Sequence, residues 1–122
     1  MSLPVITEKE LKDKRHVEIT SRDLVMFYSI GCSFCNSWEE QVEQLVSKYP
    51  QINFFKIVVT DVTLPICAPP VVPSLVAFEN GYRAWEALGS LQNTGPLEVM
   101  INEWLANLIN IKNVSGSQFI SP

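Results

Sequence analysis

Apolar runs and their spacing divide the chain into a short series of predicted strands. Residues 24–28 form a continuous apolar run typical of a buried strand, and residues 52–59 are rich in β-branched and aromatic residues, which favours another. Residues 75–78 and 82–88 are separated by a turn that contains Asn80-Gly81, a pair suited to positive φ angles. The pattern therefore predicts two strands followed by a β-hairpin.

The N-terminal region predicts a short edge strand and a polar helix. Residues 5–7 have strand composition, and Thr7 is a suitable N-cap for a charged helix over residues 8–15. His16 ends this helix. We interpret it as a favourable charge at a helix C-terminus rather than as a metal ligand or a base.

Two further helices have an apolar face. The first follows the strand at 24–28 and runs to about Lys48, before Pro50; the second runs over 97–109 and opens with Gly95 and Pro96. Their apolar positions, spaced by three and four, are Phe34, Trp38, Val42, Leu45, Val46 and Tyr49 in the first helix and Leu97, Met100, Ile101, Trp104, Leu105, Leu108 and Ile109 in the second. Both helices are expected to pack on the sheet.

The chain of 122 residues is expected to form one domain over residues 1–111, followed by a polar tail over 112–122. Four prolines between residues 61 and 73 exclude a long helix there. The net charge of −4 argues against nucleic acid or an anionic membrane as a partner.

The location expected from the sequence is cytoplasmic. No apolar run approaches the roughly 20 residues of a membrane span, and residues 1–15 carry too many charges for a secretory signal. Three cysteines, an odd number, fit a reducing compartment. Residues 1–3 also resemble an expression scar, in which case a leader or an anchor has been removed.

Two cysteines, Cys32 and Cys35, lie where the strand at 24–28 passes into the following helix. At a helix N-terminus, unpaired N–H groups and the helix dipole favour a thiolate over a thiol, which predicts a lowered pKa for Cys32. A sulfur one helical turn further on is close enough to form a disulfide with the first. This placement indicates thiol–disulfide chemistry.

Two other interpretations of the cysteine pair remain open. Together with Cys67 and His16, the pair has the composition of a Cys3His zinc site, although such sites usually use two short ligand pairs. It also fits an inert structural disulfide. The strand–helix context favours the redox pair, so no metal and no cofactor are expected.

The order of elements, the Cys-x-x-Cys pair and the stretch from Val72-Pro73 to the Asn-Gly turn together resemble thioredoxin. Gly89 matches the glycine that lines the substrate groove in that family, and Lys56 matches its strand lysine. The resemblance covers about residues 5–110. It implies an α/β thioredoxin fold, with a central mixed β-sheet flanked by helices in the order βαβαβ(loop)ββα.

The resemblance also implies roles and partners. Cys32 is then the attacking nucleophile and Cys35 the resolving thiol of an enzyme, a protein-disulfide oxidoreductase. The peptide bond before Pro73 is then cis, which leaves the backbone of Val72 free to pair with a substrate. Implied partners are protein disulfides and a reductase such as thioredoxin reductase, and we expect a monomer. The substrate-binding residues implied are Gly31, Ser33, Phe34, Val72, Pro73 and Gly89.

The chain departs from thioredoxins around the cysteines. Thioredoxins usually read Trp-Cys-Gly-Pro-Cys, whereas Gly31 precedes Cys32 here and Ser33 and Phe34 follow it. Tyr28-Ser29 and the aromatic Phe34 are similar to the active site of glutaredoxin, which favours a glutathione-dependent disulfide reductase as the alternative. The Gly-Gly pair with which glutaredoxin helps hold glutathione has no counterpart in residues 78–88.

Two more positions affect the expected chemistry. Met26 stands where thioredoxins carry a buried Asp that exchanges the proton of the resolving thiol, which leaves solvent or Lys56 for that task. Met26 itself is interpreted as a core residue. Cys67, six residues before Pro73, is interpreted as an inert small hydrophobe, with a regulatory or dimer-forming thiol as the alternative.

Overall fold

The computed structural model describes residues 3–16, 20–59, 71–89 and 93–106. Along the chain the elements are α1 (Glu8–Asp13), the 3₁₀ helix η1 (Lys14–His16), β1 (Arg22–Tyr28), α2 (Ser33–Val46), β2 (Asn53–Val58), β3 (Ser74–Glu79), β4 (Tyr82–Leu88) and α3 (Gly95–Leu105). Their order agrees with the sequence-based prediction apart from the first strand, which is reduced to a single bridge at Val5.

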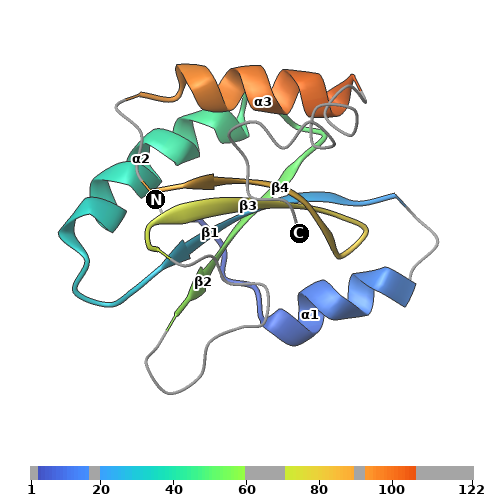
Figure 1. Cartoon of the computed structure of the whole chain (residues 1–122), viewed down its shortest axis with the longest axis horizontal. Coiled ribbons are helices and arrows are strands. Elements are labelled where there is room, and N and C mark those ends of the chain that lie inside the picture. Colours follow the sequence, from blue (N-terminus) through green and yellow to red (C-terminus); the bar gives the residue numbers. More distant parts are fainter. Residues whose placement is uncertain (1–2, 17–19, 60–70, 90–92, 107–122) are drawn as a thin grey trace.

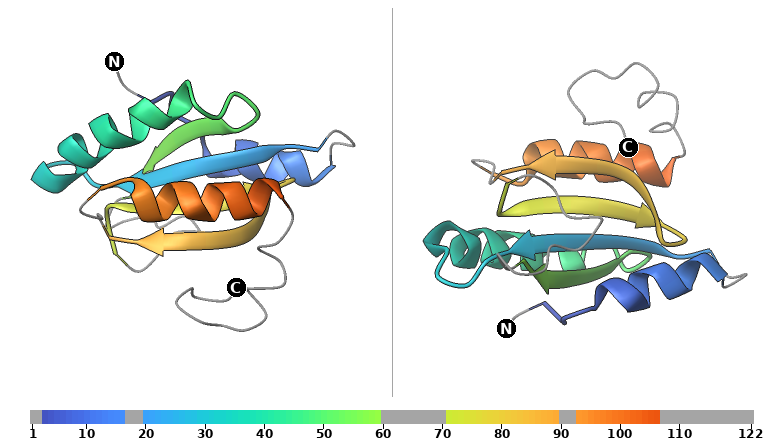
Figure 2. Two further views of the ribbon diagram at one scale, coloured as in Figure 1. Left: turned by 90° about the horizontal axis from the view of Figure 1, so that it is seen from above. Right: turned by 60° about the horizontal axis from the view of Figure 1, so that its bottom comes forward.

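The strands form one mixed sheet in the order β2-β1-β3-β4, visible from bottom to top in the right view of Figure 2. β1 and β2 are parallel, which is possible because α2 forms the crossover between them. β1 and β3 pair antiparallel, as do β3 and β4. The carboxyl end of β1 therefore meets the amino end of β3.

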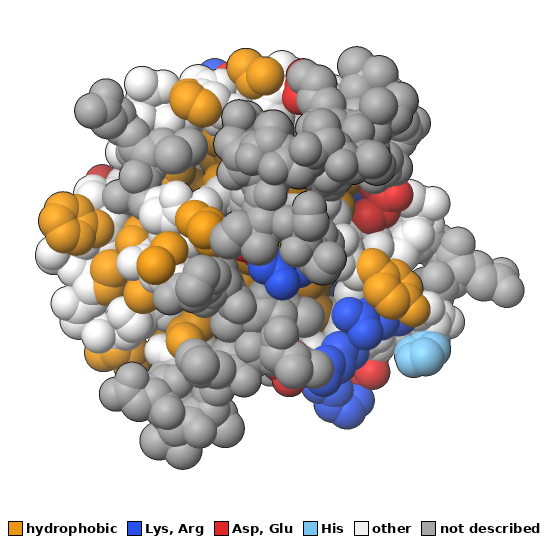
Figure 3. All heavy atoms as spheres, in the orientation of Figure 1, with side chains coloured by type: hydrophobic (Ala, Val, Ile, Leu, Met, Phe, Trp, Pro, Cys, Tyr) orange, Lys and Arg blue, Asp and Glu red, His pale blue; other side chains and the backbone are white. Residues whose placement is uncertain are grey.

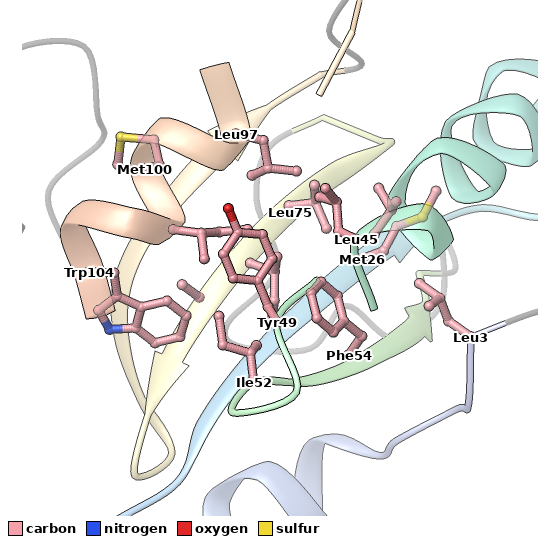
Figure 4. Close-up of a cluster of buried hydrophobic side chains, with 14 of the residues drawn as sticks. Leu3, Met26, Leu45, Tyr49, Ile52, Phe54, Leu75, Leu97, Met100 and Trp104 are labelled. Carbon is pink, nitrogen blue, oxygen red and sulfur yellow. The ribbon is translucent and has the colours of Figure 1, made fainter. Parts of the chain in front are cut away.

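Helices cover both faces of the sheet, with α2 and α3 on one side and α1 on the other (Figure 1). The larger hydrophobic cluster lies under α2 and α3 and takes Leu24 and Met26 from β1, and Figure 4 shows part of it. The smaller cluster, which includes Leu11 of α1, takes Val25 and Phe27 from the same strand. Because successive side chains of a strand point to opposite faces, the two-sided cover explains the uninterrupted apolar run in β1.

The N-terminal strand predicted over residues 5–7 is reduced to one bridge between Val5 and Lys56. The pairing stops because Thr7 begins the next helix: its side chain accepts from Glu10 N–H, and the Glu10 carboxylate accepts from Thr7 N–H. α1 ends at Asp13, and the remaining residues to His16 form the 3₁₀ turn η1 rather than a continuous α-helix.

Other boundaries differ little from the prediction. α2 ends at Val46 instead of about Lys48, because the Leu45 carbonyl accepts from both Lys48 N–H and Tyr49 N–H and closes the last turn. The hairpin turn is confirmed, with φ of 54° at Asn80 and 80° at Gly81. The predicted tail over 112–122 lies outside the described residues.

Candidate active site

Cys32 is the N-cap residue of α2, one turn beyond the carboxyl end of β1. Gly31, with φ of 84°, turns the chain into the helix in a conformation that a side chain disfavours. The Cys32 N–H donates to the Ser29 carbonyl at 3.4 Å, which closes the turn. The strand–turn–helix geometry predicted for this cysteine is therefore present.

The two cysteines are joined in a disulfide, with 5.3 Å between their Cα atoms. The backbone N–H of Cys35 donates to Cys32 Sγ at 3.2 Å. Cys35 is only 3% exposed, while Cys32 is partly exposed at the helix end. Within the described part of the chain, Cys32 is therefore the more accessible of the two sulfur-bearing residues, and Cys35 is nearly closed to solvent.

A second segment lies at the same end of the sheet. Ser74 is in register with Phe27, so Pro73 lies opposite Tyr28, immediately before the turn that carries Cys32. The Val72–Pro73 peptide bond is cis, as the resemblance to thioredoxin implies. Figure 1 shows the start of α2 and the start of β3 at this common end.

Gly89, at the end of β4, is the third segment at this end of the sheet. Its N–H donates to the buried Ser74 hydroxyl at 2.9 Å, which ties the end of β4 to the residue after Pro73. Gly89 has φ of 73°, and among the described residues a Cβ placed on it would meet nothing within 4 Å. As far as the described residues go, the space beside Gly89 is therefore open.

Three exposed apolar side chains lie on the segments that carry the cysteines and Pro73, and we call them the apolar rim: Ile30 is 86% exposed, Phe34 70% and Val71 46%. The neighbouring segments 29–37, 71–74 and 87–89 contain no charged residue. Figure 3 shows hydrophobic side chains gathered at the end of the molecule where α2 begins. Sequence reasoning identified Phe34 but not Ile30 or Val71.

An ion pair lies on the buried side of the site. Lys56 Nζ contacts Glu39 Oε2 at 3.0 Å, and both side chains are nearly buried. Met26 is 1% exposed and packs in the core, as predicted. Sequence reasoning named Lys56 and overlooked Glu39, although Glu39 follows Cys35 by four residues and so lies on the same side of the helix.

The structure does not support the predicted alternative of a zinc site. His16 ends η1 beside the hairpin turn, near the start of β1, whereas the two cysteines follow the end of β1. The seven residues of β1 separate the start of the strand from its end by roughly 20 Å. Among the described residues, no group of three His, Cys, Asp or Glu side chains could hold a metal ion. Cys67 lies outside the described residues.

Solved structures with the same architecture include several thioredoxins. Thioredoxin f2 of Chlamydomonas reinhardtii superposes with a TM-score of 0.70 at 16% identity, over 84% of this chain and 95% of that one. Mitochondrial thioredoxin 3 of Saccharomyces cerevisiae gives 0.67 at 21% identity, over 83% and 94%. A mutant thioredoxin of Halobacterium salinarum gives 0.67 at 27% identity, over 84% and 88%.

This chain has the thioredoxin fold. The fold and the resemblance inferred from the sequence are both confirmed, with a Cys-x-x-Cys pair at disulfide distance. No protein-family model and no curated protein matches the sequence. Among the described residues, no helix is long and apolar enough to cross a membrane.

Proposed function

We propose that this thioredoxin-fold chain is a thiol–disulfide oxidoreductase that exchanges electrons with protein disulfides. The observation that carries the proposal is the placement of the Cys32 sulfur as the N-cap of α2, where it accepts the Cys35 N–H. A negative sulfur is favoured at this position by the hydrogen bond and by the helix dipole. The partial exposure of Cys32 allows a substrate disulfide to approach it.

The reaction proceeds through a mixed disulfide. The Cys32 thiolate attacks one sulfur of the substrate disulfide, and the other substrate sulfur leaves as a thiolate. Cys35, after losing its proton, attacks Cys32 Sγ and releases the second substrate thiol. Two electrons pass to the substrate, and the Cys32–Cys35 disulfide remains. A reductase of the thioredoxin reductase type would return the enzyme to its dithiol form.

The surface around the disulfide supports protein segments as substrates rather than glutathione. Glutathione carries two carboxylates and an ammonium group, whereas the segments 29–37, 71–74 and 87–89 offer no charged side chain. The apolar rim instead suits an uncharged, apolar peptide around the substrate cysteine. By the resemblance to thioredoxin, the backbone of Val72 would supply the polar partner for an extended chain.

Reduction of a protein disulfide by the purified dithiol protein tests the proposal. Reduced protein mixed with disulfide-bonded insulin should separate the insulin chains catalytically when dithiothreitol or thioredoxin reductase regenerates the dithiol. Cys32→Ser should abolish the activity, and Cys35→Ser should accumulate a mixed disulfide that mass spectrometry detects. Equal turnover in the parent and the Cys35→Ser protein would contradict the assigned roles.

The glutaredoxin-like alternative is tested by the choice of reductant. If glutathione and glutathione reductase alone support turnover as fast as thioredoxin reductase does, then the enzyme is glutathione-linked. A metal-binding module would instead show bound zinc or iron near one equivalent after anaerobic purification. Both measurements use the full chain, so that Cys67 is present.

A further inference from the structure

The resolving step requires Cys35 to lose a proton from a buried position. The attacking species in thiol–disulfide exchange is the thiolate, yet Cys35 is 3% exposed and packs in the large hydrophobic cluster. Met26, in the same cluster, is apolar, and Figure 4 shows it with Leu3 on the side of the sheet that α2 covers. A proton acceptor must therefore come from elsewhere than β1.

Glu39 lies one helical turn beyond Cys35. Side chains four residues apart in a helix are neighbours, and each is tilted toward the helix N-terminus, so that Glu39 extends back toward Cys35. The Glu39 side chain is only 13% exposed. A nearly buried carboxylate thus lies one helical turn from the thiol that must be deprotonated, on the same side of α2.

Contacts with two other segments hold this carboxylate in place. The Lys56 ammonium donates to Glu39 Oε2 at 3.0 Å and Oε1 at 3.3 Å, and Leu3 N–H donates to Oε2 at 2.8 Å. Lys56 is in register with Met26, and its ammonium lies 5.2 Å from the ring centre of Tyr28, two residues nearer the active site. The ion pair therefore lies between the levels of Met26 and Tyr28.

Another carboxylate that contacts a side chain of this cluster is Glu79, which accepts from Trp104 Nε1 at 3.0 Å and pairs with Arg22 at the start of β1, the end opposite the disulfide. From β1 the titratable side chain is Tyr28, and from β2 it is Lys56. The residues that β3, β4 and α3 contribute to this cluster are apolar or aromatic: Leu75, Ala77, Ala84, Trp85, Ala87, Leu97, Met100, Ile101, Trp104 and Leu105. Among the described residues, Glu39 is thus the carboxylate placed to serve Cys35.

We propose that Glu39, held by Lys56, accepts the proton of Cys35 during resolution of the mixed disulfide. The inference rests on the proposed oxidoreductase function and names a further residue for it. The proton passes from Cys35 Sγ to a Glu39 carboxylate oxygen, directly or through one water. The Cys35 thiolate then forms a bond to Cys32 Sγ, the bond from Cys32 to the substrate sulfur breaks, and the substrate thiolate leaves and takes a proton from solvent.

A pH-jump experiment isolates this step. In a Cys67→Ser background, Cys32 is converted at low pH to its mixed disulfide with thionitrobenzoate. A jump to a series of higher pH values then starts resolution, and the absorbance of released thionitrobenzoate gives its rate. The parent is compared with Glu39→Gln, which keeps an acceptor for Leu3 N–H but loses the charge. Glu40→Gln, an exposed neighbour with the same change in charge, is the matched control.

The proposal predicts a pH-selective loss. Near pH 7, Glu39→Gln should release thionitrobenzoate about tenfold more slowly than the parent. This loss is smaller than the ~100-fold or more that is typical for removal of a positioned base, because water remains an alternative proton acceptor. The gap should close only well above the ordinary thiol pKa of about 8.5, where solvent deprotonates Cys35 unaided, because burial disfavours its thiolate. Glu40→Gln should follow the parent at every pH.

A variant with the carboxylate moved to β1 provides an independent test of the proton-acceptor role. Met26→Asp combined with Glu39→Gln places a carboxylate on β1 beneath the same thiol and should restore most of the rate near pH 7. A folded double variant that stays as slow as Glu39→Gln overturns the inference. So does a Glu39→Gln rate that equals the parent's, or that is lowered equally at all pH values, as a purely structural effect would be.

Failure of the proposed function gives a different result from failure of this inference. If Cys35 does not resolve disulfides at all, then the parent adduct itself releases no thionitrobenzoate after the jump. If only the role of Glu39 is wrong, then the parent releases it and Glu39→Gln behaves identically. Urea unfolding of each variant, followed by fluorescence, confirms that the compared proteins are folded.

Discussion

Cys32 and Cys35 differ in their surroundings although three positions separate them in the sequence. Cys32 caps the helix and accepts a backbone N–H, whereas Cys35 is buried one turn inside α2. The first environment favours a thiolate, and the second disfavours a charged sulfur through desolvation. This asymmetry is what a nucleophile followed by a resolving thiol requires.

At the scale of single residues, we predict a lowered pKa for the Cys32 thiol in the reduced protein. The Cys35 N–H and the α2 dipole stabilise the thiolate, so the charged form should persist to a pH below the ordinary cysteine value of about 8.5. The rate of iodoacetamide alkylation against pH, measured in Cys35→Ser, gives the midpoint. A midpoint at or above 8.5 would contradict an activated Cys32.

At the scale of elements, α1 is fastened to the β-hairpin turn. Arg15 Nε donates to the Gly81 carbonyl at 2.9 Å, and a Cβ on Gly81 would lie 2.5 Å from the Leu11 carbonyl oxygen. Gly81 therefore serves both the positive φ of the turn and the close approach of α1. The sequence predicted the first requirement from the Asn-Gly pair but not the second.

We predict that Gly81→Ala lowers the free energy of unfolding by ~2 kcal/mol or more. A Cβ at positive φ costs about 1–2 kcal/mol, and here it also displaces the α1 backbone. Gly89→Ala is the matched control, because its φ is similar but the described residues leave its Cβ free. Urea unfolding of both variants measures the difference, and equal losses would show that the contact with α1 has no energetic effect.

Asp23 joins β1 to two other segments at the opposite end of the strand from the disulfide. It is fully buried and accepts from Lys14 Nζ at 2.9 Å and from Asn53 Nδ2 at 2.9 Å, with Ser21 as a further donor. A buried carboxylate is retained only where donors replace its lost hydration. The network thus links η1, β1 and β2 without taking part in the chemistry.

We predict that Asp23→Asn destabilises the fold by ~1–3 kcal/mol, since the amide loses the charge-assisted bond to Lys14. Disulfide reduction per folded molecule should stay at the parent level. Asp13→Asn is the control, because its ion pair with Lys9 is exposed and should change stability by less than about 1 kcal/mol. Chemical denaturation together with the insulin assay checks both variants. Loss of activity without loss of stability would contradict a purely structural role for Asp23.

At the scale of the whole molecule, three segments distant in sequence meet at one end of the sheet. The turn before α2, the segment before β3 and the end of β4 converge there because β1 and β3 are antiparallel neighbours and β4 returns along β3. Together they make an uncharged surface with exposed apolar side chains around the disulfide. If the chain acts on protein disulfides as proposed, we expect its substrate preference to depend on this assembled surface.

We predict that Phe34→Ser lowers kcat/KM for a protein disulfide about five- to tenfold, as expected for truncation of a contacting aromatic side chain. The rate with a small disulfide such as dithiobis(nitrobenzoate) should change much less, because that substrate presents far less surface to the apolar rim than a protein segment does. Val99→Ser, at a residue on α3 that is 57% exposed, is the control and should leave both rates unchanged. If Phe34→Ser lowered the rate equally with both substrates, then the substitution would act on the reactivity of the Cys32–Cys35 pair and not on binding of the protein substrate.

Features that depend on neighbouring residues could be predicted from the sequence. Strand and helix periods, the Thr7 cap, the Asn80-Gly81 turn and the position of the cysteine pair at a helix start all follow from local chemistry, and each is present. The resemblance to thioredoxin added the cis bond before Pro73, which is also present. Element ends were less predictable, because they depend on which carbonyls the last turn satisfies.

Tertiary structure decided what lies beside the active site. Glu39 and Lys56 are seventeen residues apart and form an ion pair because β2 lies next to β1 beneath α2. In the sequence alone, Glu39 cannot be distinguished from the other glutamates of the same helix. The exposure of Ile30 and the burial of Trp85 follow from the packing of the helices on the sheet. The sequence does not show which apolar side chains are buried and which are exposed. Local pattern therefore determines where the sulfurs lie, and long-range packing determines which charges and surfaces surround them.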